Sequence, residues 1–330
     1  MTIRHALTAQ ERAEIYAAAN AAVWRSHQQT FAIHGSSPRE DQFVAAMVTV
    51  GVDQLVTGWQ DLLAQRGIAL RITGVFCHGS PQVEYTGGPL PLKGVELADL
   101  LVVHQSHGSG GRTRTTAKLV QAKMSSHCSL PATDRQLFLY KHWPVFEFSA
   151  TSGLDRRPRN LGRVSGGCGY ALILHHREYP EDIRWADQCP WGSCLPAQRL
   201  GIANSFANTL GDMLFMRDGR ACSIDNPRGE WSRTVRDLLQ QSGARPSSVV
   251  SSFGGSHRSH SRHVNPNASI ADPTRTTLVT ADSMTVGPSD SVAGPPISLE
   301  QHYPSGGDRG LSVIMISTEF DATASEGQGA

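Results

Sequence analysis

Two short apolar runs joined by a glycine-rich connection constrain the fold of this chain more than any other feature. The first run, 96–103, reads E-L-A-D-L-L-V-V, and the second run, 117–124, reads A-K-L-V-Q-A-K-M. Between them lie Gly108, Gly110 and Gly111. Apolar runs separated by glycines predict two strands with a loop between them. The chain is therefore expected to build a sheet around this pair of strands.

Polar residues lie at the ends of these two predicted strands. Glu96 and Asp99 open the first strand, and Gln121 and Lys123 lie near the end of the second. Residues two apart on a strand point to the same face, so Gln121 and Lys123 should lie together. Glu96 and Asp99 are three apart and should face opposite ways, unless Glu96 still belongs to the preceding loop. Carboxylate, amide oxygen and ammonium groups on adjoining strands predict a site for a divalent metal and a phosphate.

Asp99, about twenty residues of connection, and then Gln121-Ala122-Lys123 resemble the PD-(D/E)XK nuclease superfamily in its Q-x-K form. Ala98 takes the place of the proline that usually precedes the aspartate, and Gln121 takes the place of the usual acidic residue. The resemblance covers roughly residues 36–175. It implies a metal-dependent phosphodiester hydrolase with a restriction-endonuclease-like core.

The resemblance also implies a role for each site residue. Asp99 would be the principal metal ligand, Gln121 would supply a weaker oxygen ligand, and Lys123 would orient the attacking water or stabilise developing charge. Nucleases of this superfamily often carry a further metal-binding glutamate on the first core helix, and Glu40 is the candidate for it. A helix-capping role for Glu40 is the alternative. Because Gln121 removes one negative charge, Glu96 or Glu84 would gain importance as an additional acid.

The order of predicted elements agrees with the core of that superfamily. The predicted elements are helix 37–65, then strands 68–76, 96–103 and 117–124, then a second helix, and finally strand 170–175. The second helix lies within 133–146 and is expected to end at Pro144. The expected fold class is α/β, with an α-β-β-β-α-β core, additional helices and a long disordered insertion near the C-terminus. Ser37, Pro38 and Glu40 form the expected start of the first core helix.

The chain divides into five predicted segments. Residues 1–35 hold a packing helix that begins at a capping box formed by Thr8 and Glu11, and residues 36–243 form the nuclease-like domain with helices near 202–216 and 230–241. Residues 244–309 are rich in Ser, Pro, Gly, His and Thr, which is typical of disorder. Residues 310–318 hold a returning strand that could join the sheet, and residues 319–330 are expected to form a disordered tail.

Charge and cysteine content narrow the possible functions less than the motif does. The chain has 30 Lys plus Arg and 29 Asp plus Glu, a formal net charge of +1, so only a local basic patch could bind nucleic acid. Six dispersed cysteines favour reduced thiols and a cytoplasmic location. The sequence begins without an apolar signal-peptide core, and no run is long enough to span a membrane.

The leading hypothesis is a Mg²⁺-dependent endonuclease, with Mn²⁺ as a substitute, in bacterial antiviral defence or restriction. DNA is its expected substrate, and RNA is the alternative. The resemblance implies DNA as substrate and, as partners, an ATPase, a helicase or another defence protein, or further copies of the chain. One alternative is a non-catalytic nuclease-like domain that binds nucleic acid or a protein within an assembly. Another is an α/β domain of unrelated function. No P-loop or G-x-S-x-G motif points to an ATPase or an α/β-hydrolase.

Overall fold

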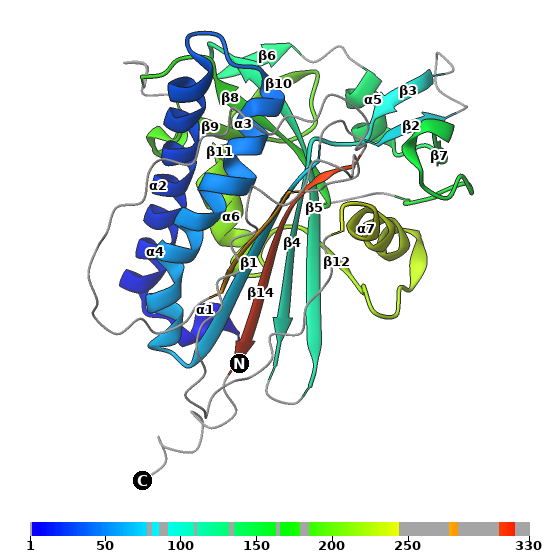
Figure 1. The fold of residues 1–330 in the computed structure, drawn as a ribbon. Coiled ribbons are helices and arrows are strands. Elements are labelled where there is room, and N and C mark those ends of the chain that lie inside the picture. The colour runs from blue at the N-terminus through cyan, green and yellow to red at the C-terminus, as the bar shows by residue number, and fades with distance from the viewer. Residues whose placement is uncertain are drawn as a thin grey trace, which may run out of the picture.

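A mixed β-sheet flanked by helices forms the centre of the protein in a computed structural model (Figure 1). The structure describes residues 2–77, 81–85, 92–108, 111–131, 135–162, 166–178, 185–243, 277–282 and 310–320. The sheet has nine strands in the order β11-β9-β8-β5-β4-β14-β1-β13, with β12 paired to β5 beside this path. The pairs β4–β14 and β5–β8 are parallel, whereas the other pairs are antiparallel.

The strands of this sheet come from widely separated parts of the chain. They are β1 (Ile68–Phe76), β4 (Leu100–His107), β5 (Thr113–Ser125), β8 (Cys168–Leu174), β9 (Trp191–Cys194), β11 (Asn204–Ser205), β12 (Arg220–Cys222), β13 (Thr277–Asp282) and β14 (Ser312–Phe320). A separate sheet has the order β3-β2-β7, from β2 (Gln82–Tyr85), β3 (Leu92–Glu96) and β7 (Phe146–Phe148). Strands β6 (Ser129–Pro131) and β10 (Arg199–Gly201) form a two-stranded pair.

Helices cover both faces of the central sheet. One face packs against α2 (Ala9–His34), α3 (Glu40–Ala46), a π-helical turn (Met47–Gly51), α4 (Val52–Ala64) and α6 (Phe206–Leu214), with the short α1 (Ile3–Ala6) beside them. The other face packs against α5 (Arg135–His142), α7 (Gly229–Gln241) and the small sheet. Alternate residues of β4 and β5 enter the two cores, as the two-residue period of a strand requires. The predicted α/β class is confirmed.

Local signals predicted the first helix and the first strand well. Thr8 accepts a hydrogen bond from the backbone of Glu11, and the Glu11 carboxylate accepts one from the backbone of Thr8, which completes the predicted capping box. The helix continues to His34 because its apolar side packs against α4 and α6. Strand β1 has the predicted bounds, 68–76.

The second helix differs from its prediction. It begins at Glu40 with Arg39 at the N-cap, so the predicted cap at Ser37 is wrong. The backbone N–H of Arg39 is satisfied by the Gln42 side chain at 2.8 Å. The predicted continuous helix to residue 65 is interrupted by the π-helical turn. There Gly74 of β1 lies so close that an added Cβ would be 1.7 Å from the Val48 carbonyl oxygen, so only glycine fits.

The predicted strand 96–103 is two strands. Glu96 ends β3 in the small sheet, and β4 begins at Leu100 in the central sheet. The turn between them lets the Leu97 backbone donate a hydrogen bond to the Pro81 carbonyl at 2.9 Å. Strand β2 pairs with β3 and β7 in the small sheet. The break moves Glu96 and Asp99 onto different elements.

The returning C-terminal strand takes a central position. Strand β14 lies between β1, to which it is antiparallel, and β4, to which it is parallel. Residues 312–316 and Ser317 and Thr318 are buried, so this strand is part of the core. Within 244–309, the predicted disordered insertion, the structure describes only β13, which pairs with β1. Residues 277–282 therefore form a strand where disorder was predicted. The rest of 244–309 lies outside the described residues.

Candidate functional site

Asp99 lies at the point where the chain leaves the small sheet and enters β4. Its backbone N–H donates to the Val120 carbonyl at 3.0 Å, which fixes the turn against β5. Its Oδ2 atom accepts the Ala122 backbone N–H at 2.7 Å and also the side-chain amide Nε2 of Gln121. The structure therefore brings Asp99 and Gln121 together, as the motif predicted.

Glu40 reaches the same end of β5 from the opposite layer of helices. It is the first residue of α3, and its Oε1 atom accepts the backbone N–H of Met124 at 3.1 Å. The capping function at this helix end belongs to Gln42, so the capping interpretation of Glu40 is wrong. A carboxylate that spans from a helix to a strand fixes the distance between α3 and β5.

Lys123 and Glu96 complete the group. The positive charge of Lys123 acts on both Asp99 and Glu40, and so does the negative charge of Glu96. Glu96 and Asp99 were expected to face opposite sides of a single strand. They do not share a strand, because Glu96 is the last residue of β3 and Asp99 precedes β4. All five predicted site residues thus interact through charge or hydrogen bonds, with the charges of Lys123 and Glu96 acting on both Asp99 and Glu40.

The surplus of acids changes the protonation of the cluster. Burial raises the pKa of Asp99 to about 7, helped by the charges of Glu96 and Glu40 and opposed by the Ala122 hydrogen bond and the charge of Lys123. Burial also raises the pKa of Glu40, with Glu96 and Asp41 adding to the shift and Lys123 and the Met124 N–H opposing it. A cation placed among these groups would favour their ionised forms.

Gln121 is the most deeply buried member of the cluster, with 1% of its surface exposed. Its amide nitrogen donates to Asp99, while its Oε1 atom is buried without a hydrogen-bond partner in the described structure. A buried amide oxygen without a partner costs free energy. The Gln121 side-chain oxygen could therefore coordinate a metal ion.

The donor set agrees in chemistry with Mg²⁺, which binds carboxylate and amide oxygens. Asp99, Glu40 and Gln121 could supply such oxygens, and Glu96 could supply a further one. Among the described residues, no three His, Cys, Asp or Glu side chains form a ready-made metal-binding group. Binding an ion would therefore need the carboxylates to turn toward one another.

Other residues that the sequence singled out lie elsewhere. Glu84 is on β2, opposite Glu147 of β7. His104 is fully buried between the Met213 carbonyl and the Thr318 hydroxyl, both at 2.9 Å, and burial lowers its pKa to about 4. It is a core residue with no access to the site. The basic, His-rich stretch H-R-S-H-S-R-H at 257–263 lies outside the described residues.

Comparisons with known proteins gave no match to any protein-family model, curated protein or solved structure. The PD-(D/E)XK resemblance therefore depends on the motif and on the geometry described above. Within the described part of the chain, no helix has the length and apolar character needed to cross a membrane.

Sequence reasoning missed a group of arginines on and beside α7. They come from R-R-P-R at 156–159 and from Arg233 and Arg236 of the helix. The first stretch holds three arginines in four residues, which was a detectable signal of a local basic patch. Helix α7 lies against residues 156–159. This packing depends on tertiary contacts, so the sequence could not predict it.

Proposed function

We propose that the protein is a metal-dependent endonuclease that hydrolyses DNA phosphodiester bonds, in bacterial defence or restriction. The observation that supports this function is that Asp99 and Glu40 accept the backbone N–H groups of Ala122 and Met124, the two chain neighbours of Lys123 on β5. An acid-rich, partly desolvated cluster beside a single lysine is suited to holding a cation and a phosphate together.

Each residue of the cluster has a distinct role in this proposal. Asp99 and Glu40 would hold the cation, and Gln121 would add an amide oxygen. When bound, Mg²⁺ would neutralise phosphate charge and lower the pKa of a water. Lys123 places its ammonium beside the reacting phosphate, where it orients the attacking water and stabilises developing negative charge. The hydrogen bonds from Ala122 and Met124 hold the two carboxylates in place.

Cutting of supercoiled plasmid and of single-stranded DNA tests the proposal. The protein is assayed with Mg²⁺, with Mn²⁺ and with EDTA. Metal-dependent cutting is expected, and Lys123→Ala should lower it by at least about 10²-fold because one charge-stabilising donor is lost. Full activity of purified Lys123→Ala protein would refute the assignment.

Lys118→Ala is a matched control. Lys118 lies on the same strand, but its ammonium pairs with Asp218 at 2.5 Å, away from the cluster. This variant should lose some thermal stability and keep its cutting rate per folded molecule. Equal losses of cutting in both variants would mean that Lys123 acts only through folding.

A non-catalytic nuclease-like domain is the second candidate. One observation favours it: Oδ2 of Asp99 already accepts two hydrogen bonds, from Gln121 and from Ala122. If these bonds persist when metal is added, the cluster would serve structure alone. DNA binding without cutting under any metal condition would support this candidate.

A further inference from the structure

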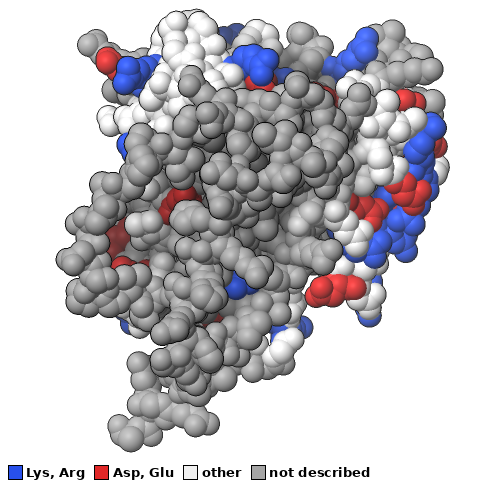
Figure 2. Space-filling view, viewed as in Figure 1, with Lys and Arg blue, Asp and Glu red and all other residues white. Residues whose placement is uncertain are grey.

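A second charged region lies on the same face of the sheet as the candidate site, around α7. We define the arginine face as Arg156, Arg157, Arg220, Arg228, Arg233 and Arg236. Figure 2 shows Lys and Arg side chains gathered along the right-hand edge of the molecule, the side on which Figure 1 places α7. Residues 154–162 and 220–241 hold seven arginines and four acidic residues, whereas the whole chain has a net charge of only +1. Positive charge is therefore concentrated here.

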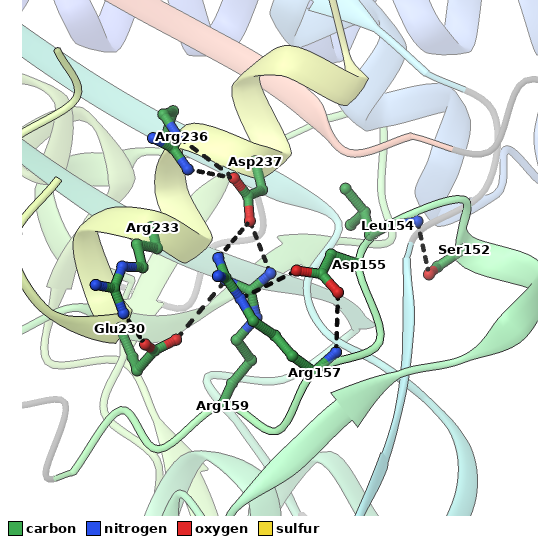
Figure 3. A network of polar contacts seen from close by, with 9 residues as sticks. All are labelled: Ser152, Leu154, Asp155, Arg157, Arg159, Glu230, Arg233, Arg236 and Asp237. Carbon is green, nitrogen blue, oxygen red and sulfur yellow. Dashed lines mark hydrogen bonds and ion pairs between the residues drawn. The ribbon is translucent and has the colours of Figure 1, made fainter. Parts of the chain in front are cut away.

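A buried ion cluster holds the two segments of this region together. Arg159 is fully buried and donates to Asp237 at 2.7 Å (Figure 3). Its guanidinium carbon lies 5.4 Å from the centre of the Phe148 ring. Its second guanidinium nitrogen lies 3.9 Å from Glu230. The outer arginines share the same two acids: Arg233 lies 2.5 Å from Glu230, and Arg236 and Arg157 lie 3.3 Å and 3.8 Å from Asp237. With seven arginines and four acids in the two segments, positive charge is still in excess.

The outer arginines remain accessible. The side chains of Arg157 and Arg233 are 43% and 42% exposed, and Arg156 and Arg228 are also exposed. Arg156 and Arg228 make no ion pair within the described part of the chain. Exposed guanidinium groups in excess over acids are typical of a surface that binds phosphates.

A pocket of about 400 Å³ opens into this surface at the start of α7. Arg220 and Arg228 line it, together with Asn160, Trp231 and Ser232. The Arg220 guanidinium lies 5.6 Å from the centre of the Trp231 ring and donates to the Leu161 carbonyl at 3.1 Å. These contacts hold Arg220 in place within the pocket, so a phosphate entering between the two arginines would find one donor already oriented.

The arginine face and the candidate site lie along the same strand, β5. Arg220 pairs with Ala117 on β5, and Lys123 is six residues further along the same strand. At about 3.4 Å per residue the separation along the strand is roughly 20 Å. Ala117 and Leu119 pack in the same core as Trp231, and Gln121 and Lys123 continue that alternation, so both regions belong to one face of the sheet.

We infer that the arginine face binds the phosphate backbone of the DNA substrate about six base pairs from the position that is cut. Duplex DNA rises about 3.4 Å per base pair, so a continuous duplex reaches from the pocket to Lys123. The inference rests on the proposed function for its choice of DNA. Binding at this face is electrostatic and independent of base sequence.

Binding is measured with the full-length protein and a fluorescently labelled 30-base-pair duplex in EDTA, by anisotropy, at several salt concentrations. The test variant combines Arg156→Gln, Arg228→Gln and Arg233→Gln. Its affinity should fall by on the order of tenfold, and the slope of log affinity against log salt should decrease by about 3, about one for each lost phosphate contact. Changing the same three residues to lysine should restore binding, since charge is what the phosphates recognise.

A control variant removes the same charge elsewhere. Arg4, Arg25 and Arg177 are exposed and lie on α1, on α2 and after β8. Replacing them with Gln should leave affinity and salt slope unchanged within about twofold. Equal losses in the control and test variants, or no binding by the wild type, would overturn the inference.

The outcome separates this inference from the nuclease proposal. Duplex binding that depends on the arginine face, with no cutting under any metal condition, would support the inference while the nuclease proposal fails. Cutting that depends on Lys123, with unchanged binding by the arginine-to-glutamine variant, would overturn the inference and leave the nuclease proposal intact.

Discussion

The candidate site and the α7 cluster both take charged groups out of water, but they balance those charges differently. At α7, the buried Arg159 meets Asp237 and Glu230, so each enclosed acid faces a guanidinium. At the end of β5, Asp99, Glu40 and Glu96 share one lysine, and the pKa values of Asp99 and Glu40 rise. A buried contact between two segments is stable when its positive and negative charges are paired. Acidic charge in excess over basic charge costs stability and is expected at a site that binds a cation.

Breaking the balanced cluster should have the largest effect on stability. Asp237→Ala leaves the fully buried Arg159 without its closest partner. We expect the free energy of unfolding to fall by about 3–5 kcal/mol, because an uncompensated buried charge remains. Urea denaturation followed by tryptophan fluorescence measures this change. A loss under about 1 kcal/mol would show that Arg159 draws on other partners.

Adding a cation should relieve the unbalanced cluster. Mg²⁺ at about 100 times its dissociation constant should stabilise the wild-type protein by about 2.7 kcal/mol at pH 8. The stabilisation should be absent in Asp99→Asn, which cannot supply the carboxylate. Thermal unfolding at several Mg²⁺ concentrations checks this. Equal stabilisation of both proteins would place the ion elsewhere.

Removing the Asp99 charge by Asp99→Asn, without adding metal, should also raise the free energy of unfolding, but by less than Mg²⁺ binding does. The pKa of Asp99 rises from 3.8 to about 7 on folding, so the folded state binds more protons than the unfolded state between these values. Stability contributed by this residue therefore falls as pH rises from about 4 to about 7. The full pKa shift corresponds to roughly 4 kcal/mol, and Asp99→Asn, which cannot titrate, should be more stable than the wild type at pH 8 by part of that amount.

Unfolding curves of both proteins from pH 4 to pH 8 test this expectation. The two free energies should converge near pH 4, separate up to about pH 7 and keep a constant difference above it. A constant difference across the whole range would show that the substitution acts through packing or hydrogen bonding, and not through the charge of Asp99.

An exposed ion pair should matter least and provides a baseline. Arg39 and Asp41 lie 2.8 Å apart with side chains 67% and 37% exposed, close in sequence to Glu40. Arg39→Gln should change the free energy of unfolding by less than about 0.5 kcal/mol, because water screens the pair. A larger change, measured by the same urea experiment, would mean that Arg39 helps to position Glu40.

The sequence by itself determined the elements whose signals are local. The capping box of Thr8 and Glu11 predicted the start of α2, and apolar patterns predicted β1, β5 and the return of the chain in β14. The spacing of Gln121 and Lys123 placed both on one face of a strand. These features depend on residues a few positions apart, so a single sequence contains the information.

Tertiary structure decided how these elements meet. Only long-range pairing put β14 between β1 and β4, ended β3 at Glu96, and brought Glu40 to the backbone of Met124. The helix begins at Glu40 and not at Pro38, and its N-cap is Arg39 and not Ser37, because Gln42 and not Glu40 accepts the backbone N–H of the N-cap residue. Strand order and the partners of buried charges depend on contacts between residues far apart in the chain, and no local pattern encodes which of several compatible pairings has the lowest free energy.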